Sequence, residues 1–359
     1  MRVAVAMSGG VDSSVAAIEL KNKGYDVIGL TMKTWPTEEC GAAGEKLCCS
    51  LESIQYARSV AEDLDVPYYV VNLSEEFARE VTGYFAEEYA KGRTPNPCVF
   101  CNSKVKFGHL LSKARQIGAE RIATGHYARI VNKDGRYFIA EAVDRKKDQT
   151  YFLYDIAKDA LSFIDFPVGE YTKDQVRAIA KKNGFMSANR EESQDICFAT
   201  ADGDYRKYLA KIGVKAFTPG NIVDMSGKVV GKHEGIASYT IGQRKGLGVA
   251  MGEPVYVLKI DTVKNVVVLG PREHAMRKAV RLKGMNWFID ESEYSKPFET
   301  MAKIRYATPK TKAAVTVREK DDVLVEFAEP QFAPTPGQAA VFYDGDLVIG
   351  GGWIEEVVG

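Results

Sequence analysis

The sequence predicts an α/β protein that begins with a doubly wound parallel sheet and continues into β-rich structure. In the N-terminal part, short apolar runs alternate with stretches of helical periodicity, as in parallel strands joined by helices. From about residue 215, β-branched segments alternate with turns, which indicates all-β structure. A chain of 359 residues is too long for one compact core. We therefore expect an N-terminal domain over 1–210, a small central β-rich domain over 211–275 and a C-terminal β-barrel over 276–359.

Strands and helices are expected to alternate along the N-terminal domain. Strands are predicted at 3–7, 26–32, 66–71 and 121–124, and helices at 15–23, 51–65 and 74–91. A proline-rich loop over 92–101 leads into a helix expected to begin near Asn102. The later segments are a hairpin over 128–142 that turns at 133–135, an exposed basic stretch over 145–151, and a helix opened by a capping box at 172–175 and closed by Gly184.

The stretch from Ser8 to Ser14, SGGVDSS, has the layout of an anion site. It follows an apolar strand and opens a helix, and its two glycines let backbone N–H groups approach a ligand closely. A Walker A loop needs a Lys-Ser/Thr pair after its second glycine, and none follows here. Asp12 can instead help to hold Mg²⁺. An ordinary strand-to-helix turn is the alternative interpretation.

This stretch resembles the signature of the PP-loop pyrophosphatase superfamily. Members of that superfamily cleave ATP between the α- and β-phosphates and transfer AMP to a substrate oxygen. The resemblance therefore implies an ATP-using enzyme, with the loop lying beyond the carboxyl end of the first strand, where parallel sheets bind their ligands.

Three cysteines form the second informative feature: Cys98-x-x-Cys101 and the later Cys197. Most buried cysteines are structural, but Cys98 and Cys101 lie in a Pro/Asn loop and not in an apolar run. A structural zinc site needs a fourth ligand at matching spacing, and the sequence offers none. Sulfur chemistry and an iron–sulfur cluster remain. No role follows for the other cysteines, which are Cys40, Cys48 and Cys49.

The composition restricts compartment and partners. Basic and acidic residues balance at 48 each, so any binding of nucleic acid must use local patches such as the run 145–147. No apolar run has the length of a membrane span, and the N-terminus does not look like a signal peptide. We expect a cytoplasmic protein without a membrane partner, whose cysteines are mostly thiols.

Motifs along the whole chain resemble the tRNA-specific 2-thiouridylase family, whose members replace O2 of the wobble uridine of tRNA with sulfur. The matching segments are SGGVDSS at 8–14, TMKTW at 31–35, TPNPCVFCN at 94–102, TGHYAR at 124–129, DQTYFLY at 148–154, SQDICF at 193–198, GKHEGIASYTIGQRKGLG at 231–248 and APTPGQAAVFYDGD at 333–346. Together they are far more specific than the glycine loop alone.

The resemblance implies roles for individual residues. The ATP contacts would be Ala6, Met7, Ser8, Gly9, Gly10, Val11, Asp12, Ser13, Met32 and Gly125. Cys197 would carry a persulfide and Cys101 would be its partner thiol, with which it can form a disulfide. The tRNA contacts would be Asn96, Pro97, Cys98, His126, Lys147, Asp148, Gln149, Arg305, Tyr306 and Gln338. The implied partners are the tRNA anticodon stem-loop and a sulfur donor protein.

One residue departs from the family pattern, because many members have an aspartate where this chain has Cys98. With Cys101 and Cys197, it makes three soft ligands, which is the number that leaves one iron of a four-iron four-sulfur cluster open. A cluster route is therefore an alternative to the persulfide route. Two other functions are also open: a PP-loop ligase that uses ammonia, and an RNA-binding module with a vestigial nucleotide loop.

Overall fold

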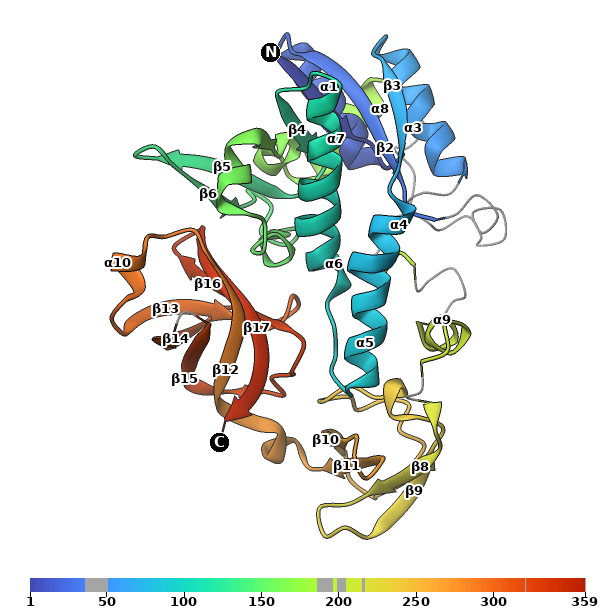
Figure 1. Ribbon diagram of the computed structural model, residues 1–359, viewed down its shortest axis with the longest axis vertical. Helices are drawn as coiled ribbons and strands as arrows, with labels where there is room; N and C mark the ends of the chain where they lie inside the picture. The colour runs from blue at the N-terminus through green and yellow to red at the C-terminus, as the bar shows by residue number, and fades with distance from the viewer. Residues whose placement is uncertain (36–50, 186–195, 199–204, 215–216, 320, 359) are drawn as a thin grey trace. The chain divides into compact units, whose positions relative to one another are not determined.

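The structure is a computed structural model of the chain. It describes residues 1–35, 51–185, 196–198, 205–214, 217–319 and 321–358. The chain divides into two compact units, whose elements are labelled in Figure 1. Unit 1 comprises Met1–Thr82, Pro97–Asp204 and Asp346–Ile349, and unit 2 comprises Gly83–Asn96, Tyr205–Gly345 and Gly350–Gly359.

The centre of unit 1 is a five-stranded parallel sheet, which confirms the predicted fold class. Its order is β3-β2-β1-β4-β7. The strands are β1 Arg2–Ala6, β2 Asp26–Lys33, β3 Tyr68–Asn72, β4 Arg121–Thr124 and β7 Ile164–Asp165. The chain runs outward from β1 through β2 to β3 and then returns to the other side of β1 with β4. The strand order thus reverses between β1 and β4, and such a reversal is where open α/β sheets bind ligands.

Helices flank this sheet (Figure 1). In unit 1 they are α1 Val11–Asn22, α3 Leu51–Asp63, α4 Ser74–Phe77, the π-helix η1 Ala78–Gly83, α6 Pro97–Phe100, the π-helix η2 Cys101–Leu110, α7 Leu111–Gln116 and α8 Lys173–Lys182. The 3₁₀ turns are η3 Thr150–Phe152, η4 Lys158–Phe163 and η5 Pro167–Glu170. Because helices cover the sheet, the interior residues of β1 are completely buried.

Two helix boundaries differ from expectation. The first helix begins at Val11 and not at residue 15, directly after the glycine pair. The helix expected near Asn102 begins five residues earlier, at Pro97, because the fixed φ of proline suits the first helical turn, where its missing N–H has no partner to lose. Cys98 therefore lies inside the first turn and not in the preceding loop.

The hairpin and the capping box are confirmed. Strands β5 Ala128–Lys133 and β6 Arg136–Glu141 are joined by Asp134 and Gly135, both with positive φ. Thr172 and Gln175 form the reciprocal capping bonds of α8. The stretch 145–151 was expected to be exposed, which is wrong for its second half: Asp148, Thr150 and Tyr151 are buried.

Unit 2 contains two all-β parts, as the sequence predicts. The first is a four-stranded sheet in the order β10-β11-β8-β9. Its strands are β8 Gly220–Val223, β9 Val229–His233, β10 Tyr256–Asp261 and β11 Val266–Gly270. The helical segments of unit 2 are α5 Tyr84–Ala90, α9 Tyr205–Lys211, η8 Ile236–Ser238, η9 Arg272–Ala275 and α10 Glu291–Tyr294.

The second β part is a six-stranded antiparallel barrel. It runs β12-β15-β14-β13-β16-β17 and closes through pairing of β12 with β17. The strands are β12 Met276–Trp287, β13 Phe298–Lys303, β14 Thr311–Glu319, β15 Asp322–Phe332, β16 Ala339–Asp344 and β17 Leu347–Val358. Closure removes the exposed edges of the sheet.

Candidate active site

The turn after β1 is shaped by Gly9, whose φ is +71°. A Cβ at this position would lie 2.3 Å from the backbone oxygen of Ser53, so no other residue fits. Gly10 is the N-cap residue of α1 and has an extended backbone conformation. Because glycine has no side chain, none of its atoms bonds to the first N–H groups of the helix as a capping side chain would. The start of α1 can therefore receive an anion.

The serines of the loop fix its geometry. The hydroxyls of Ser13 and Ser14 each donate to the carbonyl of Gly10 at 3.0 Å. The backbone N–H of Ser8 donates to Ser13 Oγ at 3.2 Å. Ser13 and Ser14 are buried, whereas Ser8 is exposed. The buried pair thus holds the turn, and the exposed Ser8 has its hydroxyl 3.4 Å from Ser13 Oγ.

The sheet brings Gly125 to the same place. Ala6 pairs with Thr124 across β1 and β4, so the residues that follow the two strands are neighbours. A Cβ at Gly125 would lie 2.6 Å from both Asp12 C and Ser13 N. Gly125 therefore packs directly against the first turn of α1, next to the glycine loop.

The other predicted ATP contacts lie along the same edge. Met7 continues β1, and its carbonyl accepts a hydrogen bond from the Thr31 hydroxyl at 2.7 Å. Met32 follows Thr31 in β2 and is half-buried. The register of β1 and β2, in which Ala6 pairs with Leu30, places Met32 beyond the end of β1. All of these predicted positions thus belong to one end of the sheet.

Two residues near Asp12 were missed by sequence reasoning. Lys173 Nζ lies 2.8 and 2.9 Å from the two carboxylate oxygens of Asp12, and the Tyr127 hydroxyl donates to Asp12 Oδ1 at 2.9 Å. Lys173 is the first residue of helix α8, and its side chain is only 7% exposed. A lysine in the first turn of a helix is repelled by the positive end of the helix dipole. The place of Lys173 in the sequence could therefore have indicated that an acidic side chain pairs with it.

A chain of polar contacts joins His126 to the helix that carries the cysteines. Thr124 Oγ1 lies 2.6 Å from His126 Nδ1, and Lys106 Nζ lies 3.4 Å from His126 Nε2. Lys106 also donates to Asn102 Oδ1 at 2.8 Å. Burial first, and the Lys106 ammonium second, lower the pKa of His126 well below its ordinary value of 6.5. The imidazole is therefore neutral at pH 7.

The three predicted sulfur residues are all half-buried. Cys98 lies in α6 and Cys101 opens the π-helix η2. Cys197 is followed by Phe198, which is buried and meets Phe77 of α4 edge to face at 5.9 Å between ring centroids. Helix α4 also packs against η2, so one short helix contacts the segments of both Cys101 and Cys197.

Within the described residues, no group of three or more His, Cys, Asp or Glu side chains is arranged to hold a metal ion. The cluster route thus remains a hypothesis about Cys98, Cys101 and Cys197. The other three cysteines, Cys40, Cys48 and Cys49, lie outside the described residues.

The predicted tRNA contacts of unit 1 differ in accessibility. Lys147 is half-buried. Asp148 is buried, and its carboxylate accepts bonds from Ala142 N, Thr150 N and Thr150 Oγ1. Gln149 is half-buried and accepts a hydrogen bond from Tyr127 N through its side-chain oxygen at 2.9 Å. The structure thus assigns Asp148 and Gln149 to holding the loop.

The predicted contacts of unit 2 are also partly engaged. Arg305 Nη2 donates to the carbonyls of Ile241 and Ala333, at 3.0 and 2.7 Å. Tyr306 is 39% exposed, and Gln338 donates to the carbonyl of Thr94 at 2.9 Å. Asn96 and Pro97, at the boundary between the units, are both buried.

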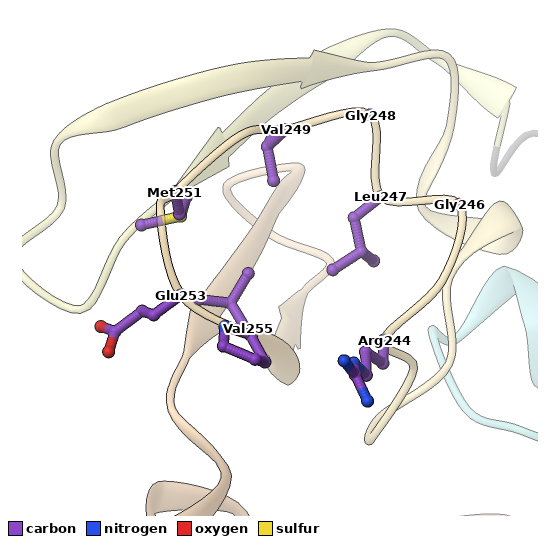
Figure 2. A pocket seen from close by; sticks show the side chains of 9 residues that line it. Arg244, Gly246, Leu247, Gly248, Val249, Met251, Glu253 and Val255 are labelled. Atoms are coloured by element: carbon purple, nitrogen blue, oxygen red, sulfur yellow. The ribbon is translucent and has the colours of Figure 1, made fainter.

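A separate pocket of about 310 Å³ lies in the central part of unit 2, formed by residues 244–255. Figure 2 shows the side chains of Leu247 and Val255 directed into it and the carboxylate of Glu253 directed away. Its lining combines the aliphatic side chains of Leu247, Val249 and Val255 with the charged side chains of Arg244 and Glu253. The predicted catalytic residues Asp12, Cys101 and Cys197 belong to unit 1 and do not line this pocket.

Among the residues that the structure describes, no helix combines the length and apolar character needed to cross a membrane.

Comparisons with known proteins cover the whole chain. The family model described as "tRNA methyl transferase HUP domain" matches residues 1–201. Residues 206–271 match the "tRNA methyl transferase PRC-barrel domain" and residues 277–354 the "Aminomethyltransferase beta-barrel domain".

Several curated relatives match over nearly their whole length. The tRNA-specific 2-thiouridylase MnmA of Clostridium perfringens is 47% identical over 357 residues, which is 99% of each chain. The protein of that name from Carboxydothermus hydrogenoformans is 49% identical over 361 residues, covering 99% of this chain and 98% of the relative. A solved 4-thiouridine synthetase in complex with RNA and ATP is 16% identical, with a TM-score of 0.35 over 58% of this chain and 50% of that one.

Proposed function

The chain belongs to the tRNA-specific 2-thiouridylase family, PP-loop enzymes that use ATP with Mg²⁺ to thiolate tRNA, and on that premise we propose that it replaces O2 of the wobble uridine with sulfur. The observation that carries the proposal is the meeting of two sites in unit 1. The glycine loop packs against Gly125 and would form the anion site, and the contact chain from His126 through Lys106 reaches the helix that Cys101 opens.

The ATP site makes the oxygen a leaving group. A uracil C2 carbonyl is urea-like, so its oxygen departs poorly. In our proposal O2 attacks the α-phosphorus of ATP, the α–β bridging oxygen leaves as pyrophosphate, and the adenylated oxygen later departs as AMP. Residues from Ser8 to Ser13 would bind the phosphates through backbone N–H groups. Asp12 has the carboxylate that Mg²⁺ prefers, and the ion would offset phosphate charge.

Sulfur then replaces the adenylated oxygen. A donor protein would supply sulfur as a persulfide on Cys197, and its terminal sulfur would attack C2 and expel AMP. The Cys101 thiolate would next attack the Cys197 sulfur, releasing 2-thiouridine and leaving a Cys101–Cys197 disulfide that an external thiol reduces. The packing of Phe198 on Phe77, and of α4 on η2, supports this pairing.

The cluster route differs in its ligands. It needs Cys98, Cys101 and Cys197 together, whereas the persulfide route needs only the last two. Anaerobically purified protein with about four irons per chain and a brown colour would support the cluster. Active, colourless and iron-free protein would exclude it.

The test is mass spectrometry of nucleosides from tRNA incubated with the protein, ATP, Mg²⁺ and a sulfur donor. We expect 2-thiouridine at the wobble position only, and its loss in both Cys101→Ser and Cys197→Ser. Cys98→Ser is the matched third variant. Retained activity in this variant indicates the persulfide route, whereas loss of both activity and bound iron indicates the cluster. Wild-type turnover in Cys101→Ser would refute the role of that thiol. An ammonia-using ligase would not need either cysteine.

The anticodon loop suits this substrate role because its bases are already single-stranded and cheap to extrude. We propose that tRNA is bound by the segments that carry the predicted contacts. Within them His126, Lys147, Tyr306, Pro97 and Cys98 would contact tRNA, and Asn96, Asp148, Gln149, Arg305 and Gln338, whose side chains are buried or bonded to the protein, would position these segments. We also propose domain limits at 1–210, 211–275 and 276–359 and a cytoplasmic site of action. Binding should weaken steeply with salt if phosphate contacts dominate.

A further inference from the structure

Lys106 is a half-buried cation whose partners are neutral. Its ammonium donates to the side-chain oxygen of Asn102 at 2.8 Å and lies 3.4 Å from His126 Nε2. Within the described part of the chain, no carboxylate forms an ion pair with it. Lys173 differs from Lys106, because its ammonium pairs with both carboxylate oxygens of Asp12. Lys106 is therefore a half-buried basic side chain that has no counter-charge among the described residues.

The described groups packed around His126 include aromatic rings, which bring no counter-charge to Lys106. The rings of Phe107 and Phe166 pack around His126, with centroids 6.0 and 5.9 Å from the imidazole. The pKa of His126 is lowered well below its ordinary value, first by desolvation and second by the Lys106 ammonium, so the imidazole brings no second positive charge to this place. A cation that is partly removed from water and lacks a counter-charge is costly unless a ligand supplies the anion.

The position of Lys106 points to the reacting complex. His126, its contact, directly follows Gly125, which packs against Asp12 and Ser13 at the start of α1. Lys106 itself lies in η2, the helix that Cys101 opens. The ammonium thus contacts the residue that follows Gly125 and belongs to the helix that Cys101 opens.

We propose that Lys106 binds a phosphate oxygen of the reacting complex. The proposal rests on the proposed function, because that function brings phosphate to this edge of the sheet. The group is either the α-phosphate of ATP or a backbone phosphate of the anticodon. In the first case, the uridine O2–phosphorus bond forms and the bond from phosphorus to the α–β bridging oxygen breaks, with its electron pair leaving on pyrophosphate. Lys106 would stabilise the charge on the non-bridging oxygens during this exchange.

The first arm of the test measures nucleotide affinity without tRNA. Lys106→Met should weaken ATP binding by about 10- to 100-fold, the loss expected for one hydrogen bond to a charged group. Adenosine, which lacks phosphate, should bind Lys106→Met and wild type equally. Lys113→Met removes an exposed lysine further along the same helical segment and should leave both affinities unchanged. Lys106→Arg should recover part of the ATP affinity.

The second arm uses the anticodon stem-loop as the probe. If the phosphate belongs to tRNA, ATP affinity stays at the wild-type value, and the slope of log K against log salt becomes shallower in Lys106→Met by about 0.7, the value for one single-strand phosphate. Lys113→Met should keep the wild-type slope. Lys106→Gln, which keeps a donor for Asn102 without the charge, replaces Lys106→Met if that variant does not fold.

Two results would overturn the proposal. One is wild-type ATP affinity together with a wild-type salt slope in the uncharged variants. The other is an equal loss of ATP and adenosine affinity, which would show that Lys106 only supports the fold around His126. The proposed function is tested separately, because its failure means that wild-type protein makes no 2-thiouridine, whatever the affinities of the variants.

Discussion

The Lys173 ammonium is shared between both carboxylate oxygens of Asp12, at 2.8 and 2.9 Å, across 161 residues of sequence. Asp12 lies in the first turn of α1, and Lys173 opens α8. The two helices pack against each other, so the ion pair fixes the acidic residue of the glycine loop relative to the opposing helix. Tyr127 adds a hydroxyl donor to the same carboxylate.

Replacing Lys173 should therefore affect both stability and ATP use. Lys173→Met leaves a part-buried carboxylate without its cation, and we expect a cost of about 1–3 kcal/mol in the free energy of unfolding, moderated because Asp12 stays 28% exposed. The rate of pyrophosphate release with tRNA should fall at least about tenfold, because a loss of about 1.4 kcal/mol of transition-state stabilisation lowers a rate by that factor. Lys181→Met, which removes an exposed lysine of the same helix, is the control for denaturant unfolding and for turnover.

A double-mutant cycle separates the pair from its parts. Asp12→Asn with Lys173→Met should destabilise the protein by less than the sum of the single changes, since neither partner is left with an unbalanced charge. Strict additivity of the two unfolding free energies would show that the contact carries no coupling.

Gly9 should tolerate no side chain. Gly9→Ala combines a left-handed φ of +71° with a Cβ placed 2.3 Å from the Ser53 carbonyl, so the loop must move and ATP binding should be lost. Gly24→Ala is the matched control: its φ is +80°, but nothing lies within 4 Å of the added Cβ. We expect the control to lose about 1–2 kcal/mol of stability and to bind ATP normally. Equal ATP affinity in both variants would contradict a close-approach role for Gly9.

Phe198 should be needed for sulfur transfer but not for ATP binding. Phe198→Ala removes the ring that packs on Phe77 and so releases the segment holding Cys197. We expect the rate of 2-thiouridine formation to fall by about tenfold or more, because Cys197 would no longer be held in position for its reaction. ATP affinity should not change. Phe198→Leu keeps an apolar anchor and should recover most activity. If Phe198→Ala thiolates tRNA at the wild-type rate, the anchoring role is wrong.

His126 should make the protein less stable in acid. Its pKa is lowered in the folded protein, so the unfolded chain binds the proton first as the pH falls. The stability present above the unfolded pKa of about 6.5 is therefore lost as the pH falls toward the folded value. Unfolding free energies of wild type and His126→Asn, compared from about pH 8 to about pH 5, should converge in acid. A difference that stays constant across this range would contradict a lowered pKa of His126 in the folded protein.

Much of the architecture follows from local sequence signals. Alternating apolar runs and helical stretches predict the parallel sheet, and Thr172 with Gln175 predicts the start of α8. The turn at Asp134 and Gly135 predicts the hairpin. These signals succeed because periodicity, capping and left-handed turns are properties of neighbouring residues. Pro97 shows the limit, because the proline that suggested a loop instead begins the helix.

The chemistry of the loop and the cysteines is also contained in the sequence, since it depends on residue types at fixed spacing. Ser8 to Ser14 indicates an anion site, and Cys98, Cys101 and Cys197 indicate sulfur or cluster chemistry. Only the tertiary structure decides which distant groups act on them. Lys173 reaches Asp12, and Lys106 reaches His126, because strand order and helix packing bring together residues with no sequence relationship. Charge balance at the loop depends on such long-range contacts, and no local pattern encodes them.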